Sequence, residues 1–321
     1  MDNRKVVIIG DGAVGSTTAY TLMQHSYIGE IVIIDINKTK AEGDVLDMVH
    51  GLSFVSQKII KSGDYPDVKG AHVVIITAGA AQKEGETRVD LLKRNINVFN
   101  SILDSIKPYL EESTIILVVT NPVDILAYYT YKKLGISASR VIGSGTVLDS
   151  SRLKSLLSED TKIDPRNIHA YVIGEHGDSE VSAFSVSSIG GVPIRNYCAI
   201  CGKCDKNNLQ NLDVFAKKVV NAAYEIIAKK GATFYAIALS VEKIVDTIIN
   251  NQHSVLTISS LVNDKVNGRI NGVYLSLPTI VGSSGVEKIL DLEYSPEETD
   301  KLVESANKLK SLYKELNINN E

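Results

Sequence analysis

The chain has 321 residues, of which 44% are hydrophobic and 22% charged, and its formal net charge at pH 7 is −4. A chain of this length usually divides into two domains, and a mildly acidic balance without a dense basic run argues against a nucleic-acid partner. Its apolar runs are far too short to cross a bilayer, and the first residues lead into a strand and not into a signal sequence. We therefore expect a cytoplasmic globular protein without membrane segments.

Three cysteines, Cys198, Cys201 and Cys204, lie close together in one segment. An odd number in one short segment does not form a disulfide framework. The spacing resembles part of a metal knuckle, but a structural zinc site needs four ligands and no fourth Cys or His is near in the sequence. We expect a reduced, exposed loop and no bound metal; stoichiometric zinc or iron in protein purified without added metal would favour the alternative.

The first predicted element is a strand that ends in a glycine-rich turn. Residues 4–9 read as a buried strand and lead into Gly10-Asp11-Gly12-Ala13-Val14-Gly15, after which a helical pattern begins. In a G-x-G-x-x-G motif with this context, Gly10 permits the tight turn, Gly12 lets a pyrophosphate approach the backbone, and Gly15 lets helix and strand pack closely. The helix N-terminus then offers free N–H groups to the phosphates.

An acidic residue closes the second predicted strand. Residues 31–34 form an apolar strand that ends at Asp35, twenty residues after Gly15. A carboxylate at this point hydrogen-bonds the adenine-ribose hydroxyls of NAD and repels the additional phosphate of NADP. Strand, glycines, helix, strand and acid in this order predict a dinucleotide site that binds NAD.

The rest of the first half alternates strands with helices, which predicts an α/β fold with a doubly wound parallel sheet. Ligands of such sheets bind over the carboxyl ends of the strands, so functional residues should follow strands directly. The segments 77–82 and 121–124 do so. The predicted elements are strands at 73–77 and 115–120 and helices at 89–110 and 125–134.

The second half has the pattern of an α+β domain, and we place the boundary between a dinucleotide-binding domain, 1–145, and a substrate domain, 146–321. Its last element is an amphipathic helix that Ser295 caps, with Pro296 in the first turn. The other predicted elements are a helix from Asp149, strands around 168–173 and 183–189, helices at 212–230 and 233–249, and antiparallel strands at 255–258 and 272–277.

A histidine stands where the alternating run 168–173 ends. His176 lies at a turn between Gly174 and Gly177, which leave room beside its ring for a substrate and a nicotinamide. Taken alone, such a histidine is most simply a surface residue among solvated acids. Its imidazole can nevertheless both donate and accept a proton near neutral pH.

Three charged residues can accompany this histidine in the reduction of a 2-keto acid. That reaction needs a proton donor at the keto oxygen, a cation for the carboxylate and a second cation that polarises the carbonyl. Asp149 can hold the other nitrogen of His176, and Arg152, three residues further along a predicted helix, offers a planar fork for the carboxylate. Arg88 ends a polar segment that follows Gly79, and it can reach the carbonyl if this segment closes over the ligand.

Nearly end to end, the chain resembles the L-lactate/malate dehydrogenase family, and within it most closely the bacterial L-lactate dehydrogenases. A nucleotide-sensing domain or a non-catalytic relative would not need His176, Asp149, Arg88 and Arg152 together. The motifs that carry the resemblance are residues 10–15, Ala78-Gly79-Ala80-Ala81-Gln82-Lys83, Gly85-Glu86-Thr87-Arg88, Thr120-Asn121-Pro122-Val123-Asp124, Ile142-Gly143-Ser144-Gly145-Thr146-Val147-Leu148-Asp149, Gly174-Glu175-His176-Gly177-Asp178 and Gly231-Ala232-Thr233.

This resemblance implies a role for each predicted site residue in the reversible reduction of pyruvate to lactate. His176, paired with Asp149, is the proton donor, Arg152 binds the carboxylate, Arg88 the keto oxygen, and Asn121 orients the substrate. The implied NAD contacts, besides Gly10, Gly12 and Gly15, are Val14, Asp35, Lys40, Tyr65, Gly79, Ala80, Ser101, Val119, Asn121 and Ser144.

Gln82 bears on the choice of substrate. The malate enzymes of the family carry an arginine at this position, which pairs with the second carboxylate of oxaloacetate. A neutral amide, with Thr233 nearby, leaves a space suited to a methyl group, and an unpaired carboxylate buried there would cost several kcal/mol. We therefore expect pyruvate as the substrate, with malate or a branched 2-hydroxy acid as the alternative.

The resemblance also suggests an effector and an assembly. Bacterial members are often activated by fructose 1,6-bisphosphate, which an arginine and a histidine bind at a subunit interface. His169 matches the histidine, whereas Lys154 stands at the position of the arginine. A lysine attracts phosphate as a point charge but lacks the bidentate fork, so activation is expected with weaker affinity. The family pattern further favours a homotetramer.

Overall fold

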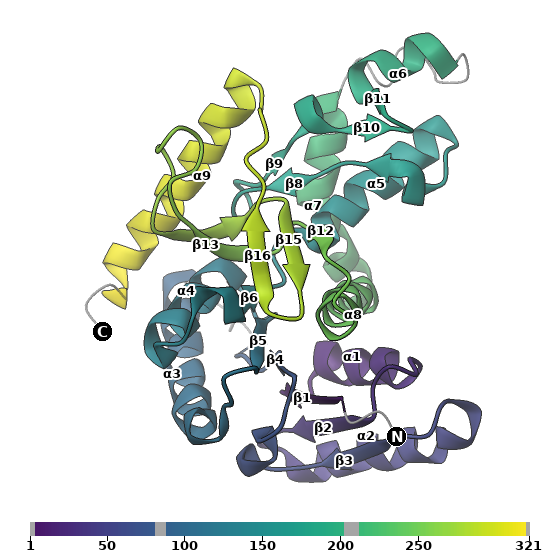
Figure 1. Ribbon diagram of the computed structural model, residues 1–321, viewed down its shortest axis with the longest axis vertical. Coiled ribbons are helices and arrows are strands. Elements are labelled where there is room, and N and C mark those ends of the chain that lie inside the picture. The colour runs from purple at the N-terminus through teal and green to yellow at the C-terminus, as the bar shows by residue number, and fades with distance from the viewer. Residues whose placement is uncertain (1–3, 81–87, 202–211, 319–321) are drawn as a thin grey trace.

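The computed structural model describes residues 4–80, 88–201 and 212–318. Its centre is an eight-stranded sheet in the order β14-β13-β6-β5-β4-β1-β2-β3 (Figure 1). Strands β1 to β6 all run parallel, so the predicted doubly wound sheet is confirmed. They are β1 (Lys5–Ile9), β2 (Glu30–Ile34), β3 (Ile59–Ser62), β4 (Val73–Ile76), β5 (Ile115–Val118) and β6 (Val141–Gly143).

Helices cover both faces of this sheet because successive side chains of each strand point to opposite sides. Val7 and Ile9 of β1 belong to a core shared with α3, α4 and α9, whereas Val6 and Ile8 belong to a second core shared with α1 and α8. The helices of the first half are α1 (Ala13–Met23), α2 (Lys38–His50), α3 (Arg88–Ile106) and α4 (Val123–Leu134).

The second half combines helices with small antiparallel sheets, as the α+β pattern predicts. Its helices are α5 (Val147–Thr161), α6 (Ile194–Cys201), α7 (Leu212–Lys230), α8 (Tyr235–Ile249) and α9 (Pro296–Glu315). Its strands are β7 (Ile168–His169), β8 (Val172–Ile173), β9 (Val181–Ser182), β10 (Ser188–Ile189), β11 (Val192–Pro193), β12 (Ser254–Leu256), β13 (Ser259–Val262), β14 (Val273–Ser276), β15 (Thr279–Gly282) and β16 (Gly285–Ile289).

Two strands of the second half extend the sheet of the first. Strand β13 pairs antiparallel with β6 through Ser259 and Gly143, and β14 pairs antiparallel with β13. A Cβ at Gly143 would lie 2.8 Å from the Cβ of Ser259, so this junction requires a glycine. The two halves of the sequence therefore share one sheet, and the functional boundary at residues 145/146 stays a prediction.

Other elements differ from the predictions for identifiable reasons. The predicted strand 183–189 is interrupted by a 3-10 turn at Phe184–Val186. The helix predicted at 89–110 ends at Ile106, since Pro108 cannot continue it. Helix α2 was not anticipated, because only Ala41 and Met48 of its residues are buried and no apolar stripe marks it. The cap of α9 is as predicted, with the Ser295 side chain accepting a hydrogen bond from the Glu298 N–H.

No helix within the described ranges is long and apolar enough to cross a membrane.

Candidate active site

The glycine-rich turn between β1 and α1 has the close packing that its motif predicts. Gly10 has a φ of +105°, and a Cβ there would lie 2.4 Å from the amide nitrogen of Ala78. A Cβ at Gly15 would lie 1.8 Å from the carbonyl oxygen of Gly10. Gly12 differs, because among the described residues nothing beyond its chain neighbours lies within 4 Å of the position of a Cβ. The backbone is thus open on the side where α1 begins, and its first N–H groups fit a pyrophosphate.

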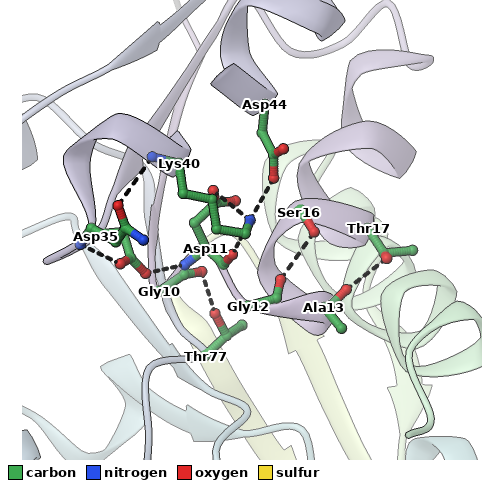
Figure 2. A network of polar contacts seen from close by, with 11 residues as sticks. Gly10, Asp11, Gly12, Ala13, Ser16, Thr17, Asp35, Lys40, Asp44 and Thr77 are labelled. Carbon is green, nitrogen blue, oxygen red and sulfur yellow. Dashed lines mark hydrogen bonds and ion pairs between the residues drawn. The ribbon is translucent and has the colours of Figure 1, made fainter. Parts of the chain in front are cut away.

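Behind this turn, polar side chains tie the end of β2 to the loop (Figure 2). The Asp35 carboxylate accepts hydrogen bonds from the Asp11 N–H, at 2.6 Å, and from the Asn37 N–H, at 2.7 Å. The Lys40 ammonium, on the first turn of α2, contacts the Asp11 carbonyl oxygen at 2.6 Å, the Asp11 carboxylate at 2.9 Å and the Asp44 carboxylate at 2.6 Å. Asp35 therefore stands beside the loop, where the ribose of a bound NAD is expected.

The other predicted cofactor residues gather at the same edge of the sheet. Gly79 and Ala80 follow β4, Val119 and Asn121 follow β5, and Ser144 follows β6. Because these strands are parallel, their carboxyl ends share one edge with the glycine turn. Tyr65, half-buried in a 3-10 turn after the parallel strand β3, also follows this edge, and burial and the nearby Asp35 raise its pKa. Val14 lies in the first turn of α1, within the glycine motif, and Ser101 is exposed on α3.

One buried residue that links these loops was not predicted. Asn95, on α3, is 1% exposed, and its side chain accepts a hydrogen bond from the Ala80 N–H at 2.7 Å. Its amide nitrogen donates to the Asn121 carbonyl oxygen at 3.1 Å. Asn95 thereby fixes the segments that follow β4 and β5 relative to each other. The signal in the sequence was a lone amide on the buried side of a long amphipathic helix.

In the second half, the structure brings together His176, Asp149 and Arg152. His176 Nδ1 lies 2.6 Å from Asp149 Oδ2, and Arg152 Nη1 donates to Asp149 Oδ1, also at 2.6 Å. Asp149 is buried in the first turn of α5, while Arg152 also lines a pocket of about 590 Å³ between α5 and α7. The arrangement leaves the Nε2 atom of the imidazole for a substrate.

The charges around this histidine favour its protonated form. Burial lowers the pKa of His176, but the ion pair and hydrogen bond with Asp149 outweigh it, and together with Asp124 and Glu180 they raise the pKa to about 9. Burial raises the pKa of Asp149, yet His176 and Arg152 hold it below its usual value. At neutral pH the pair is thus an imidazolium beside a carboxylate.

Two acids near His176 had no role in the predictions. Asp124, buried at the start of α4, accepts a hydrogen bond from the His176 N–H at 2.8 Å, and burial raises the pKa of its carboxyl to about 6. For Glu180, burial and the neighbouring Asp149 raise the pKa to about 8. Asp124 ends one motif of the sequence and Glu180 lies two residues after another, but their proximity to the ring depends on the tertiary fold.

Gly174 serves a purpose other than the predicted room for ligands. Its φ is +91°, and a Cβ there would lie 2.9 Å from the hydroxyl oxygen of Ser305. The same hydroxyl accepts a hydrogen bond from the Glu175 N–H at 2.8 Å. The glycine therefore lets α9 approach the histidine turn and hold its backbone.

The described residues also include a group with spacing suited to a metal ion. Ligand atoms of Asp149, His176 and Glu180 lie within 4.8 Å of one another. Arg152 and His176 already contact both oxygens of Asp149, so an ion at this point would displace one of them.

Several predicted residues lie wholly or partly outside the described residues. Gln82 and Cys204 belong to undescribed segments. Cys198 and Cys201 lie on α6, so the loop expected there is a helix, and their side chains, like that of Arg88, are outside the description. Thr233 is half-buried between α7 and α8. Lys154 is half-buried on α5, where burial lowers its pKa, and His169 is exposed on β7, a strand that packs against α5.

Comparison with known sequences extends this picture to the whole chain. Residues 4–143 match the lactate/malate dehydrogenase NAD binding domain, and residues 146–318 match the lactate/malate dehydrogenase alpha/beta C-terminal domain. An L-lactate dehydrogenase of Acetivibrio thermocellus is 52% identical over 315 residues, which are 98% of either chain. L-lactate dehydrogenase 1 of Clostridium acetobutylicum is 49% identical over 309 residues, 96% of this chain and 97% of the relative.

Comparison with solved structures leads to the same family as the sequence comparison. A lactate dehydrogenase from a Medee basin deep-sea metagenome library superposes with a TM-score of 0.92 at 42% identity, covering 98% of this chain and 99% of the other. The minor L-lactate dehydrogenase of Enterococcus mundtii is 39% identical. Its ligands-bound form superposes with a TM-score of 0.91, covering 97% of this chain and 98% of the other, and its ligands-unbound form with a TM-score of 0.85, covering 96% of each chain. The chain therefore belongs to the lactate/malate dehydrogenase family and is an NAD-dependent oxidoreductase.

Proposed function

We propose that this protein is an L-lactate dehydrogenase that reduces pyruvate to (S)-lactate with NADH and thereby regenerates NAD in fermentative glycolysis. The observation that carries the proposal is the pairing of His176 with Asp149, at 2.6 Å, beside Arg152. This group supplies a proton donor and a carboxylate receptor, which are two of the three functions that reduction of a 2-keto acid requires. The relatives at about half identity bear the same activity in their names.

In this mechanism the protein positions the acid and moves one proton. When bound, NADH supplies the hydride that adds to C2 of the keto acid. The His176 imidazolium donates its Nε2 proton to the keto oxygen as negative charge develops there, and Asp149 holds the opposite nitrogen and stabilises the cation. In lactate oxidation the neutral imidazole accepts the same proton. Because its pKa is about 9, His176 is protonated at neutral pH and can act as the proton donor in pyruvate reduction.

Three further residues bind and orient the substrate. Arg152 presents a planar guanidinium to the carboxylate, Arg88 polarises the carbonyl, and Asn121, directly after β5, fixes the orientation. In this proposal residues 1–145 bind the cofactor and residues 146–321 bind the substrate. Asn121 and Arg88 are the exceptions, since they belong to the first domain but contact the substrate.

Gln82 and Thr233 define the space for the substrate's side chain. A neutral amide suits a methyl group and leaves a second carboxylate without a partner, which costs several kcal/mol, or about a thousandfold in kcat/KM. Pyruvate is therefore preferred over oxaloacetate and over branched keto acids, whose reduction is the alternative function.

We also propose a homotetramer that fructose 1,6-bisphosphate activates through Lys154 and His169. Lys154 has a lowered pKa through burial, so an anion would favour its charged form. A cytoplasmic location is consistent with the proposed substrates. Light scattering with and without the bisphosphate measures the oligomeric state. A pyruvate saturation curve that does not change when the bisphosphate is added would contradict the proposed activation.

The test is the rate of NADH oxidation with pyruvate, oxaloacetate and a branched 2-keto acid in parallel. We expect pyruvate to give the highest kcat/KM, and the Gln82→Arg variant to shift the preference toward oxaloacetate. The matched control is Gln82→Asn, which keeps a neutral amide and should keep the preference for pyruvate. Equal rates with pyruvate and oxaloacetate in the parent enzyme would contradict the assignment.

A further inference from the structure

Lys40 stands beside the glycine loop, near the end of β2 where the adenosine ribose of the cofactor is expected, and its position raises a question of cofactor choice. Dinucleotide folds that bind NADP place a basic residue near the end of the second strand, where it accommodates the 2′-phosphate. Lys40 lies five residues after Asp35, on the first turn of α2. Its ammonium and the Asp35 carboxylate both contact Asp11, each at 2.6 Å, so the two charges flank one residue of the glycine loop.

This ammonium is fully engaged by the protein (Figure 2). It contacts the carbonyl and the carboxylate of Asp11 on one side and the Asp44 carboxylate on the other, at 2.6, 2.9 and 2.6 Å. The Asp11 side chain is completely buried, whereas the Lys40 side chain is 44% exposed. A buried carboxylate attracts a lysine more strongly than an exposed one, because water screens it less.

The local charge disfavours a second phosphate. Asp11, Asp35 and Asp44 oppose a single ammonium, and the other lysine of this turn, Lys38, is paired with Asp64 at 2.7 Å. Although burial alone would lower the pKa of Lys40, the hydrogen bonds that its ammonium donates to Asp44 and Asp11 raise it. A 2′-phosphate would have to break these contacts before it gained a partner.

We propose that Asp11 and Asp44 are specificity-determining residues of the cofactor site, which hold the Lys40 ammonium and so deny it to the 2′-phosphate of NADP(H). Asp35 repels this phosphate directly, and the pair formed by Asp11 and Asp44 removes the cation that would otherwise compensate for the loss of Asp35. The inference concerns the choice between two dinucleotides and does not depend on which keto acid is reduced.

The experiment compares NADPH and NADH binding in a series of variants, by the fluorescence of the reduced nicotinamide. The chain contains no tryptophan, so protein emission interferes little. The series starts from Asp35→Ser and adds Asp44→Asn, then Asp11→Ala. The control adds Asp47→Asn instead, which removes the same charge from an exposed position on α2. A final variant adds Lys40→Met to the set with Asp44→Asn and Asp11→Ala.

We expect NADPH to bind about tenfold more tightly after Asp44→Asn and Asp11→Ala than in Asp35→Ser alone, the gain of one charge-assisted hydrogen bond. Asp47→Asn should change the Kd for NADPH by less than about twofold, in line with a screened surface charge, and Lys40→Met should abolish the gain. Equal effects of Asp44→Asn and Asp47→Asn, or a gain that survives Lys40→Met, would overturn the proposal. Because Asp35 and Lys40 themselves belong to the cofactor site, the integrity of each variant is judged by its urea unfolding curve, and Asp44→Asn provides the test should Asp11→Ala fail to fold.

Discussion

Two buried aspartates, one in each half of the chain, hold a cation in contrasting ways. Asp149 contacts Arg152 with one oxygen and His176 with the other, and its pKa is lowered. Asp11 contacts Lys40 with one oxygen, its Oδ1 atom has no hydrogen-bond partner among the described residues, and burial raises its pKa. The negative charge of the buried Asp149 is therefore balanced by two cations, whereas that of the buried Asp11 is balanced by a single exposed lysine.

The two pairs also differ in their proposed roles, because the Asp149 pair can take part in the reaction and the Asp11 pair can act in the choice of cofactor. Histidine is the side chain that exchanges a proton near neutral pH, so the Asp149 pair can change charge during a reaction. Lysine keeps its charge near neutral pH, so the pair of Asp11 and Lys40 takes no part in proton transfer, and its proposed role is in the choice of cofactor.

The largest effect should come from removing the titratable partner. His176→Asn keeps the size and polarity of the side chain but cannot donate a proton, so kcat for pyruvate reduction should fall by about 10²–10⁴-fold. The Kd for NADH, measured by nicotinamide fluorescence, should stay close to that of the parent. Turnover within a few-fold of the parent would remove His176 from the mechanism.

Replacing Asp149 or Asp11 by alanine measures how much each carboxylate contributes to the free energy of unfolding. Asp149→Ala leaves Arg152 and His176 without their shared partner in a site where Arg152 is 14% exposed, and should lower the free energy of unfolding by about 3–5 kcal/mol. Asp11→Ala leaves Lys40 with Asp44 and with water, and should cost about 1 kcal/mol or less. Urea unfolding at neutral pH measures both, and similar losses would show that the two pairs are equivalent.

A smaller effect should follow from Asp124→Asn. The amide oxygen can still accept the hydrogen bond from the His176 N–H, but the negative charge that helps to hold the imidazolium is gone. We expect kcat/KM for pyruvate to fall by about two- to tenfold, as for one weakened hydrogen bond, with the alkaline limb of its pH profile shifted to lower pH. A reduced rate with an unshifted limb would mark Asp124 as a purely structural residue.

The two regions also differ in how much the sequence could predict. The cofactor half is specified locally: Gly10, Gly12 and Gly15 follow a strand, and Asp35 ends the next one, so chain order alone predicts the sheet and its site. In the substrate half, the pairing of His176 with Asp149 could be proposed from residue chemistry, but not the approach of Asp124 and Glu180, because it requires α4 and β8 to pack against the same strand, β14. Asn95 and Lys40 likewise gained their contacts only from tertiary structure.

The central claim, that Asp149 keeps His176 protonated for pyruvate reduction, is tested most directly by pH profiles of kcat/KM in the parent and in Asp149→Asn. The imidazolium is the donor, so the rate of pyruvate reduction should be constant below the pKa of His176 and fall as pH rises through about 9, while lactate oxidation rises over the same range. In Asp149→Asn the limb should move toward 6.5, the ordinary value of histidine. A limb at the same pH in both enzymes would contradict the account.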